Sequence, residues 1–127
     1  MFWRMNQMKT QSVLVYCTHG TYGRDDDAYG ALLQSNAALA RGMNVTLVLV
    51  DDGVFLVKKG QNPAKIGAVN NIAELTDFID LGGKLLLLEE SLKERGLSKN
   101  EIIEGSQIIT FSDLIKEIEN TQISLTF

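Results

Sequence analysis

Short β-favouring runs alternate along the chain with segments in which apolar residues recur at helical spacing. The five runs, each of which predicts a strand, span residues 13–17, 45–50, 85–88, 107–110 and 123–127. The run 45–50 is apolar at every position but one, which is typical of a strand buried on both faces of a parallel sheet. In the last run apolar and polar residues alternate, which predicts a strand with one wet face, at a sheet edge or a subunit contact.

The segments between these runs predict helices. Small and apolar residues at helical spacing predict one helix over residues 28–39, stopped by Gly42, and another over residues 72–79. A shorter helix is predicted over residues 89–95, because acidic residues fill its first turn and basic residues its last. Ser112 is predicted to cap a final helix. Shorter predicted features are a helical turn over residues 54–57, a loop over 58–67 and a capping box over 98–101.

This alternation predicts an α/β fold: a three-layer α/β/α sandwich around a mainly parallel, five-stranded sheet. The pattern does not order the strands. A length of 127 residues suits a single domain. We place that domain at residues 12–127, after a flexible extension over residues 1–11. Because ligands and reactive groups collect at the carboxyl ends of parallel strands, candidate sites are expected in residues 18–27, 51–55 and 89–91.

Composition narrows the classes of function. The chain has 12 Lys and Arg against 16 Asp and Glu, a formal net charge of −4, so no direct contact with nucleic acid is expected. The longest wholly aliphatic run, Leu85 to Leu88, is far shorter than the roughly 20 residues of a membrane span, so no membrane association is expected. The first residues lack the apolar region of a signal peptide. The cytoplasm is therefore the expected compartment.

Cys17 is the only cysteine and closes the first predicted strand. A single thiol excludes an intrachain disulfide and a thiolate metal cage within one chain. Sulfur transfer requires a thiolate, which a helix N-terminus, Arg24 or His19 would favour if it pointed toward Cys17. The interpretation that we favour is a small hydrophobe buried in a strand, with its thiol pKa raised by nearby aspartates.

His19 is the only histidine and lies two residues beyond Cys17. The two side chains would form a nucleophile and base pair if they shared a face, although a loop histidine bonded to the backbone is the commoner arrangement. A lone histidine excludes a histidine metal cluster within one chain, and no metal or cofactor is predicted. The run Asp25-Asp26-Asp27 would gather a cation, but capping of the following helix explains it without a ligand.

Two turns at the predicted strand ends would form the lips of a pocket. The loop over residues 20–23 would suit a phosphate, yet it lacks the Gly-Lys-Ser/Thr ending of a P-loop and adjoins an acidic run, so we favour a tight turn. An Asp-Gly turn follows the second strand. A small-molecule or nucleotide-binding protein that uses both lips is our alternative hypothesis. The candidate crevice residues are His19, Gly20, Tyr22, Gly23, Asp52 and Gly53.

Three segments follow the first, second and third predicted strands. They are Thr18-His19-Gly20-Thr21-Tyr22-Gly23, then Asp52-Gly53-Val54-Phe55-Leu56 with Gly60-Gln61-Asn62-Pro63, then Ser91-Leu92-Lys93-Glu94-Arg95-Gly96-Leu97. In this order they resemble the DsrE/DsrF/DsrH and TusB/TusC/TusD group of small sulfur-relay proteins, most closely its DsrF/TusC branch. The resemblance covers residues 12–127. It implies a flavodoxin-like subunit of a homo-oligomer, or of a hetero-oligomer with related DsrE/DsrH-like subunits. Such subunits take persulfide sulfur from donor proteins and pass it to acceptors, in some complexes toward tRNA thiolation.

The chain departs from this pattern at one position. The sulfur-accepting subunits of the group carry their reactive cysteine at the end of the third strand, and the matching residue here is Leu88. Leucine cannot hold a persulfide. The resemblance therefore implies a structural or docking subunit, with Cys17 as an outside candidate for sulfur transfer. Whether the chain is itself an enzyme stays open. A purely structural homo-oligomer without chemistry is a further hypothesis. The predicted interface residues are Phe55, Gln61 and Phe127.

Overall fold

The five predicted strands form one sheet in the computed structural model, which describes residues 10–20, 27–68 and 70–127. The strands are β1 (Ser12–Cys17), β2 (Asn44–Leu49), β3 (Lys84–Leu88), β4 (Ser106–Ile109) and β5 (Ile123–Thr126). Their order is β4-β3-β2-β1-β5, and every neighbouring pair is parallel. The α/β prediction is thus confirmed, with a sheet that is parallel throughout.

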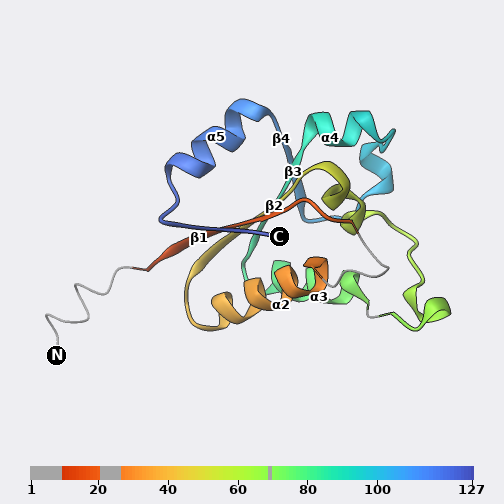
Figure 1. Cartoon of the computed structure of the whole chain (residues 1–127), viewed down its shortest axis with the longest axis horizontal. Helices are drawn as coiled ribbons and strands as arrows, with labels where there is room; N and C mark the ends of the chain where they lie inside the picture. The colour runs from red at the N-terminus through yellow and green to blue at the C-terminus, as the bar shows by residue number, and fades with distance from the viewer. Residues whose placement is uncertain (1–9, 21–26, 69) are drawn as a thin grey trace, which may run out of the picture.

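Helices lie on both sides of this sheet. The helices are α2 (Asp27–Ala40), α3 (Asn71–Asp80), α4 (Glu89–Glu94) and α5 (Phe111–Glu119), and the 3-10 helices are η1 (Asp51–Val57), η2 (Pro63–Ile66) and η3 (Lys99–Glu101). Figure 1 shows α2 and α3 side by side on one face of the sheet and α5 on the other. No described helix has both the length and the apolar character to cross a bilayer.

Two apolar clusters hold the layers together. Alternate side chains of β1, β2 and β3 point to one face, where they pack with Leu32 of α2 and Phe78 of α3. The intervening side chains point to the opposite face, where Leu114 of α5 is the only buried helical residue of the cluster in the described part of the chain. The first layer is therefore dense and the second thin, so much of the helix α5 remains exposed.

The turn that follows β2 packs onto the end of β1. The backbone N–H of Val50 donates to the carbonyl oxygen of Cys17 at 3.1 Å. A Cβ atom added to Gly53 would lie 2.3 Å from that same oxygen, which is closer than real Cβ atoms approach. Only glycine therefore fits at this point of η1, and the predicted helical turn over residues 54–57 is confirmed as part of that helix.

Two local predictions need correction. The helix α5 is capped by Thr110, whose side chain accepts a hydrogen bond from the backbone N–H of Asp113, and not by Ser112. The carboxylate of Asp113 accepts a bond from the N–H of Thr110 and completes a capping box, and these bonds hold the pKa of the Asp113 carboxyl below its usual value. The predicted loop over residues 58–67 contains η2, because Pro63 suits the first turn of a helix.

Removing the cap of α5 should destabilise the protein. Thr110→Ala deletes the oxygen that accepts from Asp113, and we expect a loss of about 1 kcal/mol in the free energy of unfolding, measured by urea denaturation. Ser112→Ala is the matched control, since Ser112 is exposed in the first turn, and it should change stability by less than about 0.5 kcal/mol. Equal losses in the two variants would contradict the assignment of the cap.

Adding one methyl group at Gly53 should be far more damaging than adding one to a helix. Gly53→Ala forces apart η1 and β1, and we expect at least about 2 kcal/mol of destabilisation by urea denaturation. Gly30→Ala is the control, because a Cβ atom there meets nothing within 4 Å and alanine favours the helix α2 by up to about 1 kcal/mol. A Gly53→Ala protein as stable as wild type would show that this contact is not tight.

Candidate functional site

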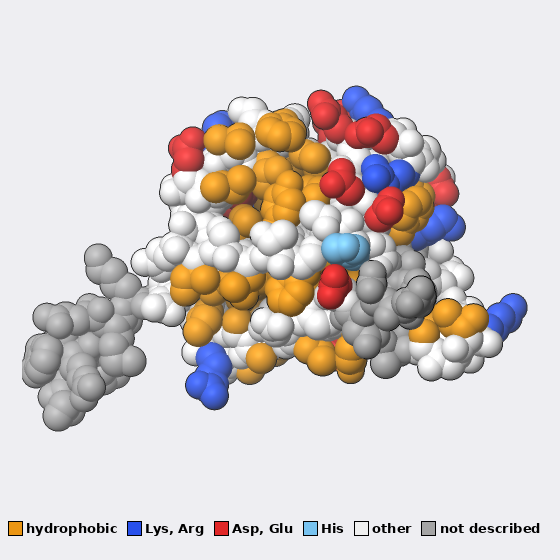
Figure 2. Space-filling view, viewed as in Figure 1, with side chains coloured by type: hydrophobic (Ala, Val, Ile, Leu, Met, Phe, Trp, Pro, Cys, Tyr) orange, Lys and Arg blue, Asp and Glu red, His pale blue; other side chains and the backbone are white. Residues whose placement is uncertain are grey.

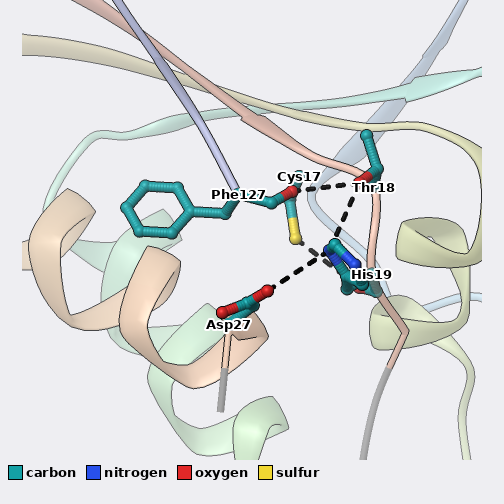
Figure 3. Close-up of polar contacts among 5 residues, drawn as sticks. All are labelled: Cys17, Thr18, His19, Asp27 and Phe127. Carbon is teal, nitrogen blue, oxygen red and sulfur yellow. Dashed lines mark hydrogen bonds and ion pairs between the residues drawn. The ribbon is translucent and has the colours of Figure 1, made fainter. Parts of the chain in front are cut away.

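The carboxyl ends of β1 and β2 bring most of the predicted site residues together. Figure 3 shows Cys17, Thr18 and His19 at the end of β1, beside Asp27 from the start of α2 and Phe127 from the chain end. Strand ends at this edge of a parallel sheet were the expected place for a site. Tyr22 and Gly23 of the predicted crevice, together with Arg24, Asp25 and Asp26, lie outside the described residues.

Cys17 is enclosed by the protein. Its exposed fraction is 0%, and it belongs to the larger apolar cluster. Its thiol donates a weak hydrogen bond to the backbone carbonyl oxygen of His19, with 3.6 Å between sulfur and oxygen. Burial raises the pKa of the Cys17 thiol; the backbone hydrogen bond with His19 lowers it by less, and the negative charge of Asp27 raises it further. The group is thus a neutral, shielded thiol at neutral pH, without the exposed thiolate that attacks a persulfide.

The imidazole of His19 turns to other partners. Its Nδ1 lies 3.6 Å from Oδ2 of Asp27 and 3.3 Å from Oγ1 of Thr18 (Figure 3). The side chains of His19 and Asp27 are about half exposed. His19 contacts the thiol through its backbone oxygen. A nucleophile and base pair requires a hydrogen bond between the imidazole ring and the sulfur, and this arrangement lacks it.

The last residue, Phe127, continues the pairing of β5 with β1. Its N–H donates to the carbonyl oxygen of Tyr16 at 2.8 Å, and its own oxygen accepts from the N–H of Thr18 at 2.9 Å. The Thr18 hydroxyl also donates to that oxygen at 3.1 Å. The ring is half-buried against the larger cluster, so the predicted interface residue closes the end of the sheet in the monomer.

The two predicted lips of the crevice touch each other. A Cβ atom at Gly20 would lie 2.9 Å from the backbone oxygen of Asp52, and Gly53 meets the end of β1 as described above. These close backbone contacts occupy the space between Gly20 and Asp52 where the alternative hypothesis places a ligand. In the described parts of the two lips, the backbones are therefore in contact and leave no open crevice between Gly20 and Asp52.

A network at the ends of β2 and β3 was not predicted from the sequence. Arg95 donates from Nε to Oδ1 of Asp52 at 3.0 Å, and from Nη1 to the carbonyl oxygen of Ser91 at 3.2 Å. The hydroxyl of the buried Ser91 accepts from the N–H of Asp51 at 2.8 Å, and Asp51 has a positive φ of 50°. Asp52 is mostly exposed, so this ion pair fixes the geometry of the turn more than it adds stability.

The other predicted interface residues lie around η1. The side-chain amide of Gln61 donates to three backbone oxygens, those of Phe55, Leu56 and Lys58, at 3.1, 3.1 and 2.7 Å. Gln61 thus caps the end of η1, a role that its position after the turn did not predict. Phe55 is half-buried against the larger cluster, which leaves part of its ring for a partner.

Leu88 stands at the carboxyl end of β3, directly before α4. It is 7% exposed and packs in the smaller cluster, on the sheet face covered by α5. Leu88 and Cys17 belong to different clusters, so the buried thiol does not substitute for a thiol at the end of β3. The position that matches the acceptor cysteine is therefore an ordinary core position in this chain.

Comparison with known proteins gives concordant matches. The model of the DsrE/DsrF-like family matches residues 11–127. The uncharacterized protein MJ0989 of Methanocaldococcus jannaschii is 34% identical over 113 residues, 89% of this chain and 96% of that protein. The uncharacterized protein MK0008 of Methanopyrus kandleri is 34% identical over 115 residues, 91% of this chain and 93% of that protein.

Two solved structures share the fold. The crystal structure of the ychN protein from E. coli superposes with a TM-score of 0.85 at 22% identity, covering 93% of this chain and 100% of that one. The protein of unknown function MTH1491 from Methanobacterium thermoautotrophicum gives a TM-score of 0.69 at 10% identity, covering 92% of this chain and 99% of that one. With the family match over nearly its whole length, the chain belongs to the DsrE/DsrF-like family.

Proposed function

We propose that this chain is a subunit of a cytoplasmic sulfur-transfer assembly, in which it supplies structure and a docking surface and does not carry the sulfur. One observation carries the proposal: no thiol is accessible at either strand end, because β3 ends in Leu88 and Cys17, at the end of β1, is fully buried. Family membership supports the sulfur-relay setting. The DsrF/TusC branch remains the nearest resemblance by its Asp-Gly-Val-Phe turn.

The chemistry of sulfur transfer explains why the buried thiol matters. An acceptor thiolate attacks the outer sulfur of a donor persulfide, the S–S bond of the donor breaks, and the donor leaves as a thiolate. The attacking thiol must be ionised and reachable. Cys17 has a raised pKa and an exposed fraction of 0%, so it meets neither condition. A related subunit with its own cysteine would supply the acceptor.

The proposed role requires protein partners. We infer that the chain joins related DsrE/DsrH-like subunits or copies of itself, and that the assembly meets a sulfur donor and an acceptor protein. The net charge of −4 gives no support to a direct nucleic-acid contact, even if the sulfur ends in tRNA. Phe55, which is half-buried against the larger cluster, is the proposed docking residue.

Exposure to a persulfide donor should leave the chain unmodified. Intact-mass spectrometry of the wild-type protein is expected to show no added sulfur, because Cys17 is shielded and protonated. The same treatment after unfolding in urea is the positive control, since it exposes the thiol and should add one sulfur atom. Addition to the folded protein that Cys17→Ser abolishes would make the chain a carrier and overturn the proposed role.

Docking should depend on the ring of Phe55. Native mass spectrometry of the chain mixed with a cysteine-bearing DsrE-type subunit of the same organism should show a complex that Phe55→Asp weakens at least about tenfold. Leu81→Asp is the control, because Leu81 is exposed between α3 and β3, on the side where β3 begins, whereas Phe55 follows the carboxyl end of β2. A thermal melt checks that both variants stay folded. The absence of any complex, or equal weakening by both folded variants, would contradict this docking role.

A further inference from the structure

Among the residues that the structure describes, the strand β5 is an edge of the sheet. It pairs with β1 on one side and is the last strand in the order. Its four residues, Ile123-Ser124-Leu125-Thr126, are all exposed, and none is charged or a proline. Edge strands in monomeric proteins usually carry charges, prolines or bulges that block pairing with another chain. The composition of β5 supplies no such block.

The backbone of β5 presents unpaired groups in a defined pattern. The N–H and the carbonyl oxygen of Phe127 both bond to β1. Because these groups alternate in direction along an extended chain, those of Leu125 and Ile123 also point to β1, and those of Ser124 and Thr126 point away from the sheet. Two residues thus offer a donor and an acceptor each to a neighbouring strand.

Apolar side chains gather around this edge. The large apolar residues exposed in the described part of the chain are Leu33, Ile66, Leu81, Phe111, Ile115, Ile118, Ile123 and Leu125. Five of these eight belong to α5 or β5. Figure 2 shows apolar surface over α5 and on both sides of the band where Figure 1 places β5. Contiguous apolar surface of this kind marks a protein interface.

The opposite edge of the sheet differs in character. Beside β4 lies a cavity of about 590 Å³ whose lining includes Lys59, Lys99 and Glu104. The backbone of Lys58 bridges to Ile102 close to this edge. Charges of both signs therefore lie next to β4, although its own residues are uncharged like those of β5. The contrast between the two edges is the exposed apolar surface, which gathers at β5 and α5 and not at β4, and it favours β5 as the edge that a partner covers.

We propose that β5 pairs with the β5 of a second copy of this chain, antiparallel, about a twofold axis at Leu125. The inference rests on the assembly role proposed above, and it names one partner and one surface for it. Ser124 of each copy would exchange two backbone hydrogen bonds with Thr126 of the other, so the outward groups of both residues are satisfied. Leu125 of one protomer would lie opposite Leu125 of the other as a non-hydrogen-bonded pair, in which the Cα atoms lie about 4.5 Å apart.

Symmetry favours an identical partner over other occupants. An isologous contact places the same patch on both sides, and here the two outward residues pair with each other without any shift in register. A twofold axis perpendicular to the sheet also places the α5 helices of both protomers on the same face of the joined sheet, beside the paired β5 strands. An anionic lipid or nucleic acid would require cations, whereas β5 has none.

Disulfide trapping tests the register. In a Cys17→Ser background, Leu125→Cys carries a single thiol at the proposed axis, and the expected Cα separation lies within the range of about 4.4–6.8 Å that a disulfide spans. Mild oxidation should convert most of the protein into a reducible dimer at micromolar concentration. Ile66→Cys in the same background is the control, because Ile66 is 68% exposed on η2, away from β5. Trapping that is absent, or equal in the two variants, would overturn the proposal.

A proline at the outward position tests the backbone pairing. Ser124→Pro removes an N–H that points away from β1, so the sheet of the monomer keeps its hydrogen bonds. Sedimentation should show a dimer for the wild type and a monomer for Ser124→Pro, with the circular dichroism spectrum unchanged. A wild-type monomer, or a dimer that persists in the folded variant, would overturn the proposal. A wild-type monomer that still binds the cysteine-bearing DsrE-type subunit would reject the second copy and leave the proposed function intact.

Discussion

The structure depends on the close backbone contact at the end of β1. The carbonyl oxygen of Cys17 accepts from Val50 and lies so near Gly53 that a side chain there is excluded. This contact fixes η1 against the sheet, and η1 supplies part of the larger apolar cluster. It also seals Cys17 from water and brings Gly20 against Asp52. The strand ends that form an open crevice in many parallel α/β sheets are thus joined here by main chain.

The consequences of that contact reach the chemistry of the thiol. A cysteine at a strand end next to a helix start is a common arrangement for a reactive thiolate, because the helix N-terminus favours the charged form. Here, burial and the charge of Asp27 act in the opposite direction and raise the pKa of Cys17. The backbone hydrogen bond with His19 lowers the pKa of the thiol, but the burial of Cys17 outweighs it. The same packing that stabilises the fold therefore disfavours sulfur chemistry at this position.

The sequence predicted the fold well because its signals are local. Strand-forming runs, helix stops such as Gly42 and the turn after β2 each depend on a few neighbouring residues, and the observed strands begin and end within one residue of the predicted bounds. The strand order was not predicted, since it depends on contacts between distant segments. The cap of α5 was misplaced by two residues, because serine is on average the better cap and only the end of the preceding strand selects Thr110 over Ser112.

The site was predicted less completely, for a similar reason. The triplet of Asp52, Ser91 and Arg95 joins the ends of two strands, and no spacing in the sequence indicates that pairing. Gln61 was expected at an interface, yet its amide is used to cap η1, a contact that requires the loop to fold back. By contrast, the match of Leu88 to the acceptor position is an implication of the resemblance, and the structure adds that Leu88 is a buried core residue. A leucine fills the core position at the end of β3 as well as a cysteine would, so the family fold persists in a chain that has no acceptor thiol there. Retention of this fold is therefore evidence for shared architecture, and the chemistry has to be judged from the residue at that one position.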